Sequence, residues 1–218
     1  MPTADFDTLR RVMVDTQVRP SDVTKFPIIA AMLDVPREDF VPAAHRAVAY
    51  GETPIPLPGG REMPEPRTVA KLLDALDVEA HEDVLVIGAG PGYATALLAR
   101  MAASVVAVEE DAEMAADAEA ALAALALDNA AVVVGDLAAG QPKAAPFDVI
   151  LIEGGVETVP PALLEQLRDG GRIAAIFAEG AGEARLGVRA EGRMGWRFAF
   201  NATAPVLPGF ARARAFSL

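Results

Sequence analysis

DVLVIGAGPGYATALLA, residues 83–99, is the stretch that decides the fold. A short, continuous apolar run over 83–87 is typical of a buried strand, and the chain turns from it directly into a helix at about Tyr93. Glycines at 88, 90 and 92 lie in that turn, where they let the backbone bend sharply and approach a ligand closely. The pattern predicts a strand, a glycine-rich ligand loop and a helix.

The next predicted strand, 104–109, ends in an acid, Glu109, nineteen residues after Gly90. Ligands of open α/β sheets bind beyond the carboxyl ends of the strands, and an acid at this spacing can accept hydrogen bonds from both hydroxyls of a ribose. The combination of strand, glycine turn, helix, strand and acid therefore indicates a cofactor that contains a nucleoside.

The spacing of the glycines indicates which cofactor. A dinucleotide loop needs a small residue at the position of Tyr93, so that helix and strand can pack closely. Gly-x-Gly-x-Gly is instead the usual sequence of S-adenosylmethionine-binding loops. The predicted cofactor is therefore S-adenosylmethionine, which methyl transfer converts to S-adenosylhomocysteine. VVVGD, 132–136, adds an acid, Asp136, that either contacts the adenine amino group or caps a turn. Tyr93 either lines the cofactor pocket or packs as an early helix residue. The predicted cofactor contacts are Gly88, Ala89, Gly90, Gly92, Tyr93, Glu109 and Asp136.

From residue 67 onward, helical and strand patterns alternate, which is typical of a doubly wound, mostly parallel α/β sheet. The last two predicted strands form a C-terminal antiparallel hairpin with a turn around 192–195. The expected helices are 68–76, 93–101, 112–125 and 161–167, and the expected strands are 83–87, 104–109, 131–134, 147–152, 172–177, 184–190 and 196–204.

The N-terminal part of the sequence lacks this alternation of helix and strand patterns. A helix from Phe6, a turn at 19–22 and a second helix over 24–33 are expected from apolar residues at helical spacing. The following segment, 51–66, carries prolines at 54, 56, 58, 64 and 66 and glycines at 59 and 60, which predict an extended loop without helix. We therefore expect residues 1–66 to be an N-terminal helical appendage with a Pro/Gly-rich substrate loop. Residues 67–218 would be the S-adenosylmethionine-binding α/β domain, joined with the appendage in one structural unit.

Composition narrows the class of protein. The chain has 218 residues, of which 52% are hydrophobic and 23% charged, as in a globular protein. A net charge of −12 disfavours nucleic acid as a partner, and the absence of cysteine excludes thiolate zinc sites and a cysteine nucleophile. The two histidines are not at metal-ligand spacing, so we predict no metal site. We find no signal peptide and no apolar run of membrane-spanning length, and we expect a cytoplasmic protein that does not bind a membrane.

Several stretches together are specific to one family. They are MVDTQVRPSDVT (13–24), AAMLDVPREDFVP (30–42), AYGETPIPLPGG (49–60), PEPRTVAKLLDAL (64–76) and FDVILIEGGVETVPPALLEQLRDGGRI (147–173). On these, the chain resembles the protein-L-isoaspartate O-methyltransferase family over nearly its whole length. The resemblance implies a class I methyltransferase fold and cofactor contacts at Gly88, Gly90, Glu109 and Asp136. It also implies a protein-repair activity, in which an isoaspartyl carboxylate of a damaged protein or peptide is methylated. Such a carboxylate is already nucleophilic, so positioning and desolvation carry most of the catalysis.

One loop departs from the family pattern, Gly-Gln-Thr-Ile-Ser-x-Pro, and reads GREMPEP over 60–66. Glu62 replaces the threonine and Pro64 the serine, so the hydroxyls are lost, and Glu62 would repel a substrate carboxylate. Arg61 or Arg67 could instead hold an anion. The candidate catalytic residues are Arg61, Glu62 and Glu153, which follows the fourth strand. The alternative is that the first two are solvated charges and that Glu153 caps a turn.

Three functions stay open at this point. The first is methylation of a protein or peptide carboxylate. The second keeps the cofactor but uses a small-molecule or RNA acceptor, which the altered 60–66 loop would explain. The third is a catalytically degenerate, cofactor-binding interaction module. A nicotinamide oxidoreductase is disfavoured, because the third small residue of a dinucleotide loop is missing.

Overall fold

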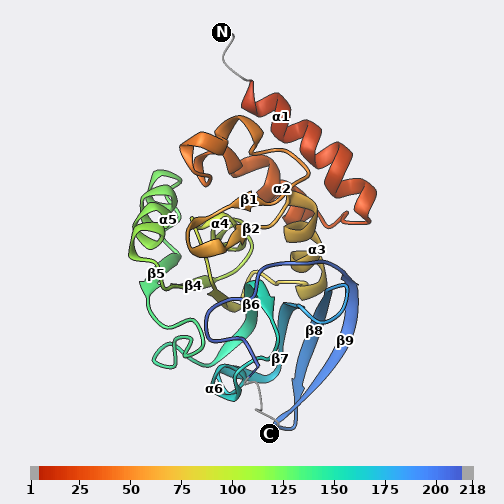
Figure 1. Ribbon diagram of the computed structural model, residues 1–218, viewed down its shortest axis with the longest axis vertical. Coiled ribbons are helices and arrows are strands. Elements are labelled where there is room, and N and C mark those ends of the chain that lie inside the picture. Colours follow the sequence, from red (N-terminus) through yellow and green to blue (C-terminus); the bar gives the residue numbers. More distant parts are fainter. Residues whose placement is uncertain (1–4, 213–218) are drawn as a thin grey trace, which may run out of the picture.

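The computed structural model describes residues 5–212 and is built on a seven-stranded sheet in the order β5-β4-β3-β6-β7-β8-β9 (Figure 1). The strands from β5 to β7 are parallel, and β8 and β9 are antiparallel, so the predicted doubly wound sheet with a terminal hairpin is confirmed. The strands are β3 (Asp83–Ile87), β4 (Ser104–Glu109), β5 (Ala130–Val134), β6 (Phe147–Val156), β7 (Leu167–Phe177), β8 (Glu183–Ala190) and β9 (Arg193–Asn201).

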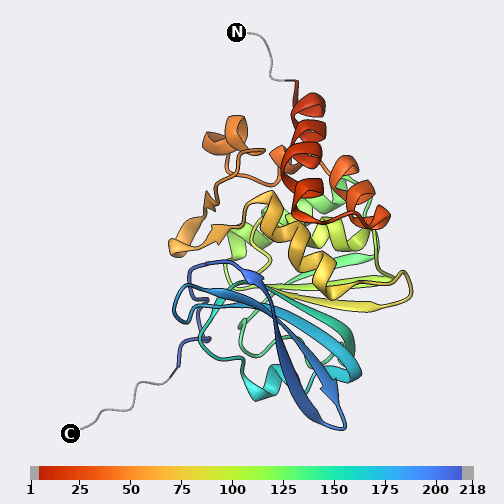
Figure 2. The ribbon, with the colours of Figure 1, turned by 90° about the vertical axis from the view of Figure 1, so that its right-hand side faces the viewer.

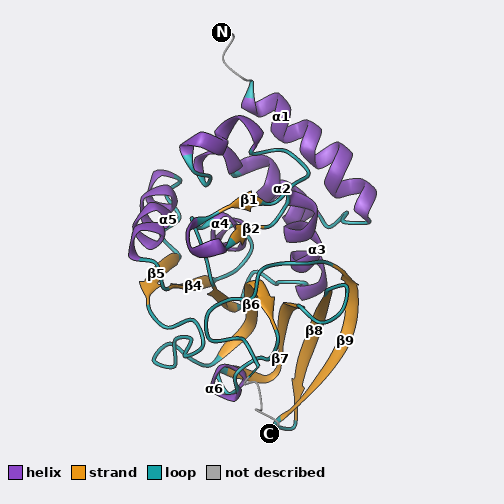
Figure 3. Cartoon of the chain, viewed as in Figure 1, coloured by secondary structure: helices purple, strands orange, loops and turns teal. Residues whose placement is uncertain are grey.

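Helices cover both faces of the sheet, as Figures 2 and 3 show. One face packs against α3 (Pro66–Leu76), α4 (Tyr93–Ala99), α5 (Ala112–Ala124) and the N-terminal helices in a single apolar cluster. The other face packs against the short helix α6 (Pro161–Leu164), which buries Leu163. None of the helices within residues 5–212 is long and apolar enough to span a bilayer.

The N-terminal segment contains the two predicted helices, α1 (Phe6–Met13) and α2 (Phe26–Asp34). Asp5 caps α1 by accepting a hydrogen bond from the amide of Thr8 at 3.1 Å. A π-helical turn, Val14–Val18, and a 3-10 turn, Arg19–Ser21, continue α1, and two further 3-10 segments follow α2 at Arg37–Asp39 and Ala43–Val48. The 3.6-residue period of apolar residues predicts α-helices and does not predict these π-helical and 3-10 turns.

Residues 55–63 form a small antiparallel hairpin, which we call the cover hairpin. In it β1 (Ile55–Pro56) pairs with β2 (Glu62–Met63) around a 3-10 turn at Pro58–Gly60. The sequence predicts an extended loop without helix here; the structure has extended arms, but it pairs them as strands and places a 3-10 turn between them, neither of which was predicted. Gly59 and Gly60 both have positive φ and reverse the chain, while the amide of Leu57 donates to the carbonyl of Arg61, so the prolines do not prevent pairing.

Four boundaries in the C-terminal half also differ from the prediction. The β8–β9 turn is at Glu191–Gly192, both with positive φ as in a two-residue hairpin, and Gly195 lies inside β9 opposite Val188. The helix α6 ends at Leu164 and not at 167, and β7 begins at Leu167 with a register shift before Val149 and Arg172 pair. β6 runs four residues further than predicted, to Val156.

Residues 202–210, which we call the C-terminal strap, return across the end of β6. The amide of Gly155 donates to the carbonyl of Pro205 at 2.8 Å, and the amide of Leu207 donates to the carbonyl of Gly155 at 2.9 Å. A Cβ on Gly155 would lie 2.3 Å from the carbonyl oxygen of Ala204. Glycine at this position is therefore what allows the strap to approach the strand.

Candidate cofactor and acceptor site

Three residues lie side by side at the carboxyl edge of the sheet. Ile87 pairs with Val108 on one side and with Ile152 on the other, and the residues that follow these three are Gly88, Glu109 and Glu153. β3 and β6 are also the neighbours between which the strand order reverses. Ligands of doubly wound sheets bind at this position.

The glycine loop adopts the predicted turn. Gly88, Gly90 and Gly92 all have positive φ, and Gly92 is the N-cap of α4. A Cβ on Gly92 would lie 2.9 Å from the Cβ of Ala118 in α5, so packing as well as backbone conformation requires glycine there. The amides of Gly88 and Ala89 are bonded to the carbonyl of Val108, which fixes the start of the loop to β4.

Glu109 is fully buried, and three donors bind its carboxylate. Oε2 accepts from the amide of Gly90 at 2.7 Å, and Oε1 accepts from the amide of Asp111 at 3.0 Å and from Nη1 of Arg61 at 2.5 Å. The sequence-predicted ribose ligand and the glycine loop are thus joined by a direct hydrogen bond.

Arg61 reaches this carboxylate from the cover hairpin. Its Nη2 also donates to the carbonyl of Gly88 at 2.8 Å, and the residue is only 6% exposed. Side chains alternate between the two sides of an extended segment, so Glu62, half-buried and opposite Pro56, is directed away from Arg61. Arg67 is exposed, with Nη2 3.9 Å from Oε1 of Glu65. Of Arg61, Glu62 and Arg67, the charged residues that the sequence singled out in and beside this loop, Arg61 is the one that contacts Glu109.

Leu57 of the cover hairpin and Leu207 of the strap close the same space. A Cβ on Gly90 would lie 3.2 Å from Cδ1 of Leu57, and one on Gly88 would lie 3.0 Å from Cδ1 of Leu207. The glycine loop is therefore covered by one charged and two apolar side chains from distant parts of the sequence.

Glu153 and Arg37 belong to a second cluster of buried polar residues. Burial raises the pKa of Glu153 from 4.5 to about 8, against the opposing fields of Arg37 and Arg61, and Oε2 has no hydrogen-bond partner among the described residues. Arg37 is completely buried, donates to the carbonyls of Ala49 and Pro64, and lies 4.7 Å from the centre of the Tyr93 ring.

Tyr93 is turned toward the N-terminal segment. Its ring packs edge-on against Phe40, with centroids 5.8 Å apart, and burial raises the pKa of its hydroxyl to about 12. This is the packing role that the sequence left open for it. Arg37, which shares the contact, was not singled out by the sequence, and its only signal was a charge inside the apolar stretch AAMLDVPREDFVP.

Asp136 lies at the outer end of the site, two residues beyond β5. It is exposed, and its Oδ1 accepts from the amide of Ala138 at 2.9 Å, so it caps the turn. The neighbouring Gly135 donates its amide to the carbonyl of Glu109 at 2.9 Å, which holds Asp136 beside the second strand.

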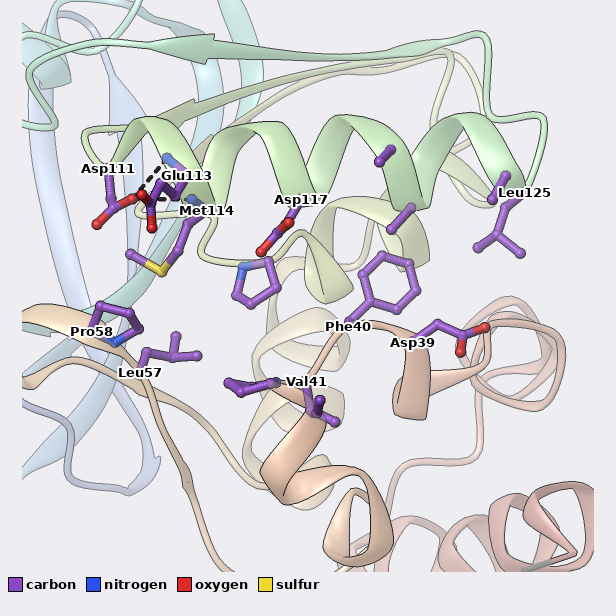
Figure 4. A pocket seen from close by; sticks show the side chains of 16 residues that line it. Asp39, Phe40, Val41, Leu57, Pro58, Asp111, Glu113, Met114, Asp117 and Leu125 are labelled. Atoms are coloured by element: carbon purple, nitrogen blue, oxygen red, sulfur yellow. Dashed lines mark hydrogen bonds between the residues drawn. The ribbon is translucent and has the colours of Figure 1, made fainter. Parts of the chain in front are cut away.

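A pocket of about 490 Å³ borders the glycine loop at Pro91. Figure 4 shows it between α5, with Asp111, Glu113, Met114 and Asp117, and the segments that carry Phe40 and Leu57. Carboxylates dominate its polar rim, so this pocket does not supply the cationic clamp that an acceptor carboxylate needs. Within residues 5–212 the structure also brings no three metal-ligating side chains together.

Comparison with known proteins decides the family. The family model of protein-L-isoaspartate (D-aspartate) O-methyltransferase matches residues 11–186. The chain belongs to this family. It is 40% identical over 192 residues to the protein-L-isoaspartate O-methyltransferase of Methylorubrum extorquens. That alignment covers 88% of this chain and 84% of the other protein. To the enzyme of the same name from Koribacter versatilis it is 41% identical over 164 residues, 75% of this chain and 74% of that protein.

Solved structures of the protein-L-isoaspartate O-methyltransferase family share the fold. One aligns with 93% of this chain and 66% of its own length at a TM-score of 0.78 and 23% identity. Another, a putative member from Plasmodium falciparum in complex with S-adenosyl-L-homocysteine, aligns over 94% of this chain and 99% of its own, with a TM-score of 0.76 and 16% identity. The predicted family and class I methyltransferase fold are confirmed, and the family acts on isoaspartyl residues of proteins.

Proposed function

We propose that this protein uses S-adenosylmethionine to methylate the isoaspartyl carboxylate of a damaged protein or peptide. The observation that carries the proposal is the buried carboxylate of Glu109, bonded to the Gly90 amide at the switch point of the sheet. Membership of the protein-L-isoaspartate O-methyltransferase family supports it.

The chain's own residues fit the adenosyl cofactor. Glu109 accepts hydrogen bonds from the ribose hydroxyls, and the bare backbone at Gly88 and Gly90 allows close approach of the ligand. Oδ1 of Asp136 accepts from the Ala138 amide, which leaves the second carboxylate oxygen of Asp136 as the group that would accept from an adenine amino group. When bound, the cofactor supplies a sulfonium methyl that passes to an acceptor oxygen, leaving a neutral thioether.

Arg37 and Arg61 hold the acceptor. Both guanidinium groups act on Glu153, which lies inside β6 and not after the strand as predicted, and the buried Glu153 is protonated at neutral pH. Two cations beside one acid carry a net positive charge whether that acid is neutral or ionised, so they attract a carboxylate, and burial strips water from it. No proton needs to be removed from such an acceptor. The lost hydroxyls of the 60–66 loop are replaced in this arrangement by Arg61.

Transfer of labelled methyl to an isoaspartyl peptide tests the proposal, with the aspartyl isomer as the matched substrate. We expect label in the isoaspartyl peptide alone. Glu109→Gln should weaken S-adenosylhomocysteine binding about 100-fold, because two charge-assisted hydrogen bonds to the ribose are lost. Glu110→Gln, at the exposed neighbouring position, should leave binding unchanged. Cofactor binding without labelling of the isoaspartyl peptide would refute this acceptor.

A second candidate has an acceptor that must lose a proton, such as an amine or a hydroxyl of a small molecule. The buried Glu153 favours it, because a carboxyl group with a pKa of about 8 can act as general base near neutral pH. A screen of amine, phenol and carboxylate acceptors separates the two. Glu153→Gln would abolish transfer to an amine or phenol but leave transfer to a carboxylate largely intact.

A further inference from the structure

Arg61 occupies the position between two buried carboxylates. Its guanidinium lies over Gly88, with Nη1 on Glu109 and Nη2 on the Gly88 carbonyl. Glu153 lies on the other side of Gly88, in register one strand away. A Cβ on Gly88 would be 3.0 Å from Cδ1 of Leu207, 3.2 Å from Nη2 of Arg61 and 3.5 Å from the backbone oxygen of Glu153, so the guanidinium lies against bare backbone here and passes beside the Leu207 side chain to reach Glu153.

A carboxylate accepts about four hydrogen bonds, so Glu109 cannot keep all three of its donors and also accept from both hydroxyls of a ribose. Two donors are backbone amides, of Gly90 and Asp111, and losing either would reshape the loop or the start of α5. The third is a long side chain on a two-stranded hairpin. Arg61 is therefore the donor that can leave without disturbing the sheet.

Glu153 offers the nearest destination. It is 6% exposed, and its Oε2 has no partner among the described residues. Neighbouring strands are about 4.8 Å apart, so a guanidinium over the end of β3 is about one strand spacing from Glu153 in β6. A guanidinium at this position would supply the hydrogen-bond donor that the buried carboxyl group of Glu153 lacks.

We propose that Arg61 is a latch on Glu109, that it leaves when ribose hydroxyls take its place, and that its guanidinium crosses Gly88 to Glu153. This inference rests on the proposed function, because it requires a cofactor at Glu109. The same arginine then stands beside Arg37, and the cationic acceptor site is complete after the cofactor has bound. Cofactor binding precedes acceptor binding for this reason.

The movement changes the protonation of Glu153. The charged groups that act on this carboxyl are Arg37, Arg61 and Glu109, and burial keeps its pKa at about 8 while Arg61 is bonded to Glu109. Arrival of the guanidinium stabilises the ionised form. Binding at pH 7 should consequently release close to one proton from Glu153.

Calorimetric titration with S-adenosylhomocysteine tests the latch. Arg61→Gln removes the competing cation and keeps an amide donor. It should bind at least tenfold more tightly than the wild type, since apparent affinity falls with the fraction of molecules in the closed form. Arg19→Gln, an exposed arginine on the N-terminal segment, removes the same charge and should bind like the wild type.

A second measurement does not depend on the Arg61 variant. Titrations at pH 7 in two buffers with different ionisation enthalpies give the number of protons released, and Glu153→Gln should release about one fewer than the wild type. Equal affinities of wild type and Arg61→Gln would overturn the latch, and so would equal proton release by wild type and Glu153→Gln. Methyl transfer to the isoaspartyl peptide would still support the proposed function. Failure of wild type and Arg61→Gln alike to bind the ligand would overturn both proposals.

Discussion

The glycine loop and the cover hairpin are both turns with glycines at positive φ, yet they are constrained differently. A Cβ on Gly92 would meet Ala118 at 2.9 Å, whereas a Cβ on Gly59 would meet no atom within 4 Å. The loop requires glycine at 92 for packing and backbone conformation together, whereas the tip of the hairpin requires glycine at 59 for backbone conformation alone. The glycine loop is therefore the more constrained of the two turns. The hairpin can carry side chains that depart from the family pattern, such as Arg61, at little cost to the stability of the fold.

The largest effect is expected from Gly92→Ala. It combines a strained positive φ of 95° with a clash against α5, and should destabilise the protein by about 3 kcal/mol. Urea unfolding measures the loss. A loss no larger than that of Gly59→Ala would contradict the distinction drawn between the two turns.

Gly155→Ala tests whether the strap is packed as tightly as the loop. The added methyl meets the Ala204 carbonyl, and we expect a loss of about 2 kcal/mol in the same urea assay. Gly195→Ala in β9 is the control, since its nearest neighbour beyond the adjoining residues would be 4.0 Å away. Similar losses for both glycines would argue against a close contact of the strap with β6.

Glu153→Gln should stabilise the protein increasingly as the pH rises. The pKa of Glu153 is about 8 in the folded protein, above its ordinary value of 4.5 in an unfolded chain, so the folded protein binds the extra proton between these values. The contribution of this proton to stability is fully present below pH 4.5 and is lost as the pH rises through 8. The variant lacks this loss, and its melting temperature should exceed that of the wild type by several degrees at pH 9 but not at pH 4.5. A pH-independent difference would show that the carboxyl titrates normally.

Gly59→Ala should have the smallest effect, about 1 kcal/mol, because it adds strain at a φ of 69° without a clash. S-Adenosylhomocysteine titration of this variant shows whether the hairpin keeps Arg61 in place. Affinity within twofold of the wild type is expected. A much larger loss of stability would mean that the hairpin is part of the rigid frame.

Local sequence patterns were sufficient to predict the two strands that carry the glycine loop and Glu109. The strands Asp83–Ile87 and Ser104–Glu109 have the predicted boundaries, since each is a continuous apolar run stopped by a glycine or an acid. The cover over the site was not predictable in this way. Arg61 and Glu109 are 48 residues apart, and nothing in the sequence near either residue indicates the pair. Gly154 and Gly155, two glycines at the end of an apolar strand, did carry a signal for the strap, because such glycines mark close backbone approach.

The position of Leu207 has a consequence for biosynthesis. A ribosome makes the glycine loop, Glu109 and Glu153 well before the side chain that closes over Gly88. Domains generally fold as units, so the cover over the ligand cavity is completed only after residue 207 has been made. Nascent chains stalled before residue 207 would lack the side chain that covers Gly88 and Gly154.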